Sequence, residues 1–264
     1  MLAVFALGLA VFVLRLAAGM IGCLLLLPSG RLRSSARQDI NPRFFRTHFL
    51  TALALAGLAL LCVRDSADWL LLSELGTAMV LAFVGSLVWG LEGAPGGRTL
   101  IVLTTLTLAG SLAWLEMTTC PVAGATGLWL LGDASSALLL GSALTAMLLG
   151  HSYLIAPTMS LTPLMRLLAV LALAVIARLS VDGYALCWTA MHSPVSLKSG
   201  DAVFLLPLRW LLGFAAPLGL TWMAWQTARI RSTQSATGIL YVVVIFCFLG
   251  ELTSQLLRGD GMTL

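Results

Sequence analysis

Eight apolar runs dominate the sequence, and each is long enough to cross a lipid bilayer as a helix. A membrane-spanning helix needs about 20 predominantly apolar residues, and the backbone of a span must satisfy its hydrogen bonds internally. The runs therefore predict an all-α fold, a polytopic membrane helix bundle of about eight transmembrane helices. We expect these helices at residues 3–27, 44–63, 69–90, 99–116, 126–156, 163–188, 202–226 and 236–257.

The composition leaves room for a membrane domain and nothing else. Hydrophobic residues make up 59% of the chain, charged residues make up 10%, and the mean hydropathy is +1.00. A soluble domain carries about 25% charged residues. Eight spans use about 160 residues, so we predict one integral membrane domain over residues 1–264. Its expected partners are the lipid bilayer and other membrane protein subunits, with no nucleic acid.

Proline and capping residues mark several breaks between the runs. Asn41-Pro42 and Thr162-Pro163 combine a helix-capping side chain with a proline suited to the first helical turn. Pro207 and Pro217 lie inside the seventh run and predict kinks in that helix. No internal sequence repeat is visible.

Basic residues in the loops predict the orientation of the chain. Cytoplasmic loops of membrane proteins carry an excess of Arg and Lys. One side of the predicted bundle holds nine of these residues and the other side holds three. We therefore expect a multi-pass protein of the bacterial cytoplasmic membrane with both termini on the non-cytoplasmic side. The nine are Arg31, Arg33, Arg37, Arg43, Arg46, Arg98, Arg166, Arg229 and Arg231, and the three are Arg64, Lys198 and Arg258.

Ionisable residues inside the apolar runs form the first candidate site. Such side chains are costly in lipid and usually face the interior of a bundle or a water-filled cavity. Arg178 and Asp182 have the i, i+4 spacing of an ion pair on one helix. The group can consist of ion pairs that hold the bundle together, or it can provide a route for protons or ions or a site for a charged ligand. Its members are Arg15, Glu74, Asp133, Arg178, Asp182, Arg209 and Glu251.

Two histidines form the second candidate site. His48 and His151 lie at matched depths near the same membrane face, on helices that run in opposite directions. They could ligate one haem b, with Arg46 and Arg166 near its propionates. The same residues could bind a quinone headgroup, with Tyr153 as a second hydrogen-bonding group, or a lipid. Alternatively, both histidines are packing residues near the membrane interface.

The sequence lacks the common catalytic and metal-binding motifs. It contains no HExxH, GxSxG, Walker loop or CxxCH pattern, so we predict a non-catalytic membrane subunit rather than an enzyme acting alone, and no metal site.

Eight helices joined by short loops resemble the quinone-interacting membrane anchors of bacterial respiratory oxidoreductases, such as the dimethyl sulfoxide reductase anchor. This resemblance covers the architecture and no motif residue. It implies an integral membrane subunit of a larger energy-transducing complex, linked to quinone and electron transport. Two alternatives stay open. One is a small secondary transporter or channel that uses the intramembrane charged residues. The other is a structural assembly subunit without a cofactor.

Overall fold

The computed structural model describes residues 2–27, 40–65, 68–91, 96–119, 126–156, 159–192 and 200–259. These residues form no strand, and eight of their helical stretches are long and apolar enough to cross a membrane. The predicted all-α bundle is confirmed. The helices are α1 (Leu2–Cys23, extended by a 3-10 turn at Leu24–Leu26), α2 (Pro42–Val63), α3 (Trp69–Val88), α4 (Gly97–Thr119), α5 (Thr126–Ile155), α6 (Thr162–His192), α7 (Gly200–Trp210), α8 (Ala216–Arg229) and α9 (Thr233–Gly259).

The predicted orientation rests partly on loop residues that lie outside the described ranges. These residues are Arg31, Arg33, Arg37 and Lys198. The placement of the two termini therefore stays a prediction.

Capping side chains fix where two of the helices begin. The Asn41 side chain accepts a hydrogen bond from the backbone N–H of Arg43 at 2.9 Å, and Pro42 is the first residue of α2. Asp68 accepts hydrogen bonds from two backbone N–H groups in the first turn of α3. Both caps satisfy N–H groups that a helix start leaves without an internal partner. The Asn41 cap explains why α2 starts two residues earlier than predicted.

The seventh span is interrupted between its two prolines. A π-helical turn at Leu211–Ala215 separates α7 from α8, and the Ala216 N–H donates to the Leu211 carbonyl oxygen, five residues back. Pro217 follows directly and has no N–H to continue the ordinary i→i−4 pattern. The kinks predicted from Pro207 and Pro217 stay a prediction, and the structure shows a π-helical turn between the two prolines, a feature that often occurs at functional sites.

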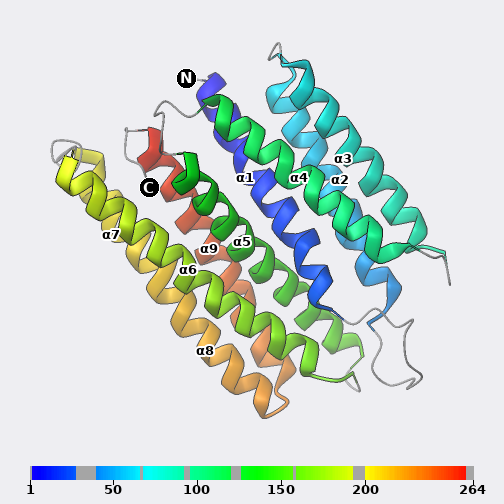
Figure 1. Ribbon diagram of the computed structural model, residues 1–264. Helices are drawn as coiled ribbons and strands as arrows, with labels where there is room; N and C mark the ends of the chain where they lie inside the picture. Colours follow the sequence, from blue (N-terminus) through cyan, green and yellow to red (C-terminus); the bar gives the residue numbers. More distant parts are fainter. Residues whose placement is uncertain are drawn as a thin grey trace.

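The spans form two groups of four, as Figure 1 shows. In the first half, α1 packs against α2 and α4, and α3 closes the ring between them. In the second half, α5 packs against α6 and α9, and α8 closes the ring in the same way. Both halves therefore arrange their helices in the same order, although the sequence shows no repeat. Because each half has four spans, equivalent helices run in the same direction.

The two halves meet along α1 and α5, their first helices. Gly19 and Gly141 face each other there, and a Cβ atom on either would overlap backbone atoms of the opposite helix. Small residues allow this kind of close helix approach within a membrane. Helix α1 is the most enclosed span, because 78% of its most apolar segment is buried. On the other helices, many large apolar side chains point outward. The outward apolar surface is suited to lipid.

Candidate functional site: a buried ionic network

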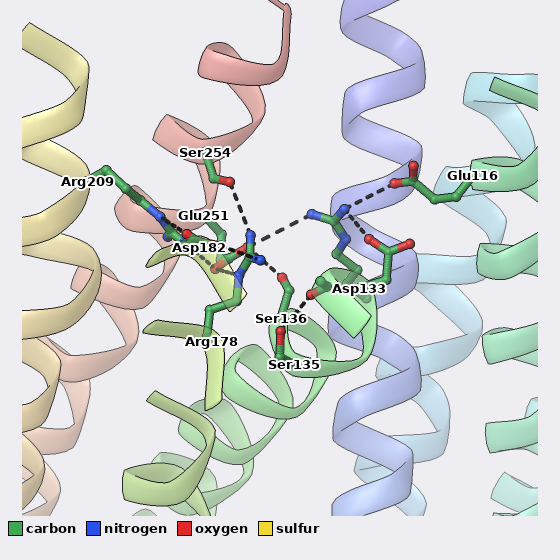
Figure 2. A network of polar contacts seen from close by, with 11 residues as sticks. Glu116, Asp133, Ser135, Ser136, Arg178, Asp182, Arg209, Glu251 and Ser254 are labelled. Carbon is green, nitrogen blue, oxygen red and sulfur yellow. Dashed lines mark hydrogen bonds and ion pairs between the residues drawn. The ribbon is translucent and has the colours of Figure 1, made fainter. Parts of the chain in front are cut away.

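Seven charged side chains meet near the junction of the two halves (Figure 2). They come from six different spans, and none of the seven residues is more than 4% exposed. Two serines join them through hydrogen bonds. The charged members are Arg15 on α1, Glu116 on α4, Asp133 on α5, Arg178 and Asp182 on α6, Arg209 on α7 and Glu251 on α9. We call this set the ionic network.

Arg15 connects the first half of the protein to the second. Its guanidinium group contacts Glu116 at 3.1 Å, on the neighbouring helix of its own half. It also forms a close ion pair with Asp133 and lies 3.9 Å from the Glu251 carboxylate, both of which belong to the second half. One arginine therefore bridges carboxylates on both sides of the α1–α5 junction.

Glu251 is the acidic centre of the second half. Its Oε1 atom lies 3.1 Å from Arg178 Nε and 2.9 Å from Arg209 Nη2. Its Oε2 atom accepts a hydrogen bond from the Ser136 hydroxyl at 2.6 Å. With Arg15 nearby, three arginines surround this carboxylate. A fully buried carboxylate stays ionised when such charges and hydrogen-bond donors compensate for the lost water.

Asp182 forms a second bridge between two of the arginines. It lies 2.6 Å from Arg178 Nη1, one turn earlier on α6, and 2.7 Å from Arg209 Nη2 on α7. The Arg178–Asp182 pair is the one that the i, i+4 spacing predicted. Arg178 also donates to the Ser254 hydroxyl at 3.1 Å. The ion pairs of this part form a closed cycle of four residues, Arg178, Asp182, Arg209 and Glu251.

Local backbone features bring Arg209 into this cycle. Gly213, in the π-helical turn, packs directly on Gly250 of α9, and a Cβ atom on Gly250 would collide with the Gly213 backbone. The Arg209 Nη1 atom lies beside both glycines, 3.0 Å and 3.2 Å from where their Cβ atoms would stand. The Arg209 guanidinium also lies 4.5 Å from the centre of the Phe214 ring, within the range of a cation–π contact.

Most of the ionisable residues singled out from the sequence belong to the network, but one does not. Glu74 lies on α3, is half-buried, and has an Oε2 atom without a hydrogen-bond partner among the described residues. Conversely, sequence reasoning missed Glu116, because the predicted helix ended at that residue. In the structure α4 continues to Thr119, so Glu116 lies inside the span. Its distance from the start of α4 is nineteen residues, close to the eighteen that separate Glu251 from the start of α9.

The two histidines have different surroundings. His48 is completely buried on α2, where its Nδ1 atom is 2.8 Å from the Phe44 carbonyl oxygen and its Nε2 atom has no partner among the described residues. His151 is exposed on α5. Helix α1 packs against both α2 and α5. The position next to His151, Gly150, faces Thr237 of α9, so this helix fills the space that a flat cofactor would need there.

The three other residues of the predicted haem or quinone site are also described. Arg46 and Arg166 are exposed on α2 and α6. Tyr153 is buried, and its hydroxyl donates to the Ser160 carbonyl oxygen in the α5–α6 connection. The described residues thus place Arg46, Arg166 and Tyr153 in separate environments.

Comparison with known proteins adds no relative to this description. No family model, no curated protein and no solved structure matches the chain.

Proposed function

We propose that this chain is a small secondary transporter in which the ionic network binds and releases a proton. The observation that carries the proposal is the charge balance of the network. Three arginines face four carboxylates, which leaves one negative charge when all seven groups are ionised. An uncompensated charge buried at membrane depth is strongly unfavourable. Binding one proton from water removes it.

The two carboxylates that pair with Arg15, those of Glu116 and Asp133, are the best candidates for the proton. Glu251 and Asp182 are each surrounded by two or three arginines. Glu116 and Asp133, by contrast, share Arg15 between them as a salt-bridge partner. Two carboxylates that share one cation repel each other, so one of them accepts a proton most readily. We therefore assign the exchangeable proton to the Glu116–Asp133 pair.

Protonation at this position would change the contact between the two halves. When Asp133 is ionised, Arg15 is held toward the second half. A proton on Asp133 weakens that attraction and leaves Arg15 with Glu116 of its own half at 3.1 Å and the more distant Glu251 of the second half at 3.9 Å. The proton thereby weakens the α1–α5 junction, while its release restores the link. A two-state junction that responds to protons is the basic requirement of proton-coupled transport.

The test measures protons directly in the purified protein. Infrared spectroscopy at neutral pH should detect a protonated carboxyl group that disappears in Asp133→Asn or Glu116→Gln. In liposomes under a potassium diffusion potential, the wild type should admit protons, and both variants should lose most of this flux. Glu74→Gln is the matched control, because it removes an intramembrane carboxyl outside the network.

One result would overturn the proposal. If the wild type holds no protonated carboxyl and its liposomes admit protons no faster than empty ones, the network is a set of structural ion pairs. Folding of each variant is checked by gel filtration and thermal unfolding, so that loss of flux is distinguished from loss of structure.

The quinone-linked subunit remains a second proposal, with a separate test. It rests on the architectural resemblance and on His48 and His151, which the described contacts do not join. A Soret band, or a quinone extracted from the purified protein and lost on His48→Ala, would support it. Without either, the interpretation fails.

A further inference from the structure

A pocket of about 820 Å³ opens between α6 and α8, and none of the residues that line it belongs to the ionic network. Small residues on both helices create this space, and two tryptophans flank it. Its volume falls in the range of about 300–1,000 Å³ that is typical of ligand sites. The small residues and tryptophans that line it are Ala169 and Ala172 on α6, and Ala215, Gly219, Trp222 and Trp225 on the seventh span.

One polar atom in the pocket lacks a partner. Thr221 lines the pocket and is 2% exposed, and its hydroxyl oxygen has no hydrogen-bond partner among the described residues. Buried hydroxyl groups are nearly always hydrogen-bonded, because an unpaired one is unfavourable. The remaining lining is apolar apart from the indole nitrogens. An occupant of this pocket would therefore be largely apolar, because the Thr221 hydroxyl oxygen is covered by its surroundings.

Two arginines lie near the pocket residues, one close to the start of α6 and one at the end of α8. Arg166 precedes Ala169 by three residues on α6, and Arg229 follows Trp225 by four residues on α8. These spacings place each arginine on the same helix face as the pocket residues, about one turn nearer the membrane face. Both arginines are exposed, as is Trp222, which is 64% exposed. Trp and Arg near a membrane face sit at the level of lipid headgroups.

We propose that this pocket binds an anionic diacyl phospholipid. The acyl chains occupy the apolar space between α6 and α8, and Arg166 and Arg229 pair with the phosphate. Basic residues at a pocket between transmembrane helices recognise anionic headgroups. The assignment is independent of the proposed proton site and of which membrane face is cytoplasmic.

Native mass spectrometry of the detergent-purified chain tests the proposal. Phosphatidylglycerol should bind more tightly than phosphatidylcholine to the wild type. The double variant Arg166→Gln/Arg229→Gln should lose roughly thirty-fold in phosphatidylglycerol affinity, as expected for two basic residues near a headgroup. Ala172→Phe should also reduce binding, because its ring fills the pocket.

Matched variants separate this site from general lipid binding. Arg98→Gln removes an exposed arginine from α4, and Ala54→Phe enlarges an exposed residue on α2; both should bind phosphatidylglycerol like the wild type. Arg166→Lys/Arg229→Lys should retain most of the affinity. Equal binding of both lipids, or equal loss in the control variants, would overturn the proposal. The proposal would also be overturned if the purified wild type retained a quinone in place of phospholipid and Ala172→Phe lost it.

Discussion

Arg15 explains much of the fold at the scale of single residues. It lies in the most apolar span, whose hydropathy of 2.4 is the highest of the eight. An arginine at mid-bilayer costs about 2.5–3.5 kcal/mol on the insertion scale when it has no partner. Helix α1 can hold this charge because Glu116 and Asp133 contact it from two neighbouring helices. The arginine therefore favours a central position for α1, where it is shielded from lipid.

Asp68 allows a pH prediction at a residue outside the spans. The Trp114 indole N–H donates to its carboxylate at 2.6 Å, and two backbone N–H groups at the start of α3 also donate to it. The Trp114 hydrogen bond, with the help of the backbone donors, lowers the pKa of Asp68 below its ordinary value of 3.8. A carboxyl whose pKa is lower in the folded state stabilises the fold above its ordinary pKa, and this contribution is lost as the pH falls below it.

The comparison of Asp68→Asn with the wild type isolates this contribution. Thermal unfolding in detergent should show the wild type to be the more stable of the two at pH 6. The difference should shrink as the pH drops below about 4. Trp114→Phe should lose most of the stability that Asp68→Asn loses at pH 6. The assignment would be contradicted if the stability difference between wild type and Asp68→Asn stayed constant as the pH fell from 6 to below about 4.

At the scale of helices, the Gly213–Gly250 contact sets how closely the π-helical turn approaches α9. Gly250→Ala introduces a Cβ atom that would collide with the Gly213 backbone and press on Arg209. We expect a loss of about 1–3 kcal/mol in the free energy of unfolding, as for overpacked cores. Gly238→Ala on the same helix is the control, because a Cβ atom there meets nothing within 4 Å. Equal thermal unfolding of the two variants would contradict the prediction.

The helices could be predicted because the bilayer restricts their length and composition. The contact of Arg178 with Asp182 was predictable too, because both residues lie on one helix. The contacts of Arg15 with Glu116 and Glu251 were not, since depth along a helix says nothing about which helices are neighbours. Residues with matched depth can be separated by another helix. Glu116 was missed for a local reason: the Gly- and Thr-rich α4 has a weaker apolar pattern, so its end was placed too early.

At the scale of the whole molecule, the two halves share a helix order that the sequence does not reveal. Contacts between helices depend on shape, small residues and apolar character, which many sequences can supply. The last helix of each half also carries a glutamate at nearly the same depth, Glu116 on α4 and Glu251 on α9, and both face Arg15. The ionic network therefore spans the junction at equivalent levels of the two halves. This arrangement is suited to coupling them.

The orientation of the whole bundle in the membrane is the last prediction. Nine basic residues against three predict that the loop around Ser35 lies in the cytoplasm and the loop around Ser196 on the opposite side. Single cysteines are introduced by Ser35→Cys and Ser196→Cys after the native cysteines are replaced. A membrane-impermeant maleimide should label the cysteine at position 196 in intact cells, and the one at position 35 only after the membrane is opened. Labelling of both in intact cells would contradict the orientation. It would leave the ionic network intact, because the same side chains meet whichever face is cytoplasmic.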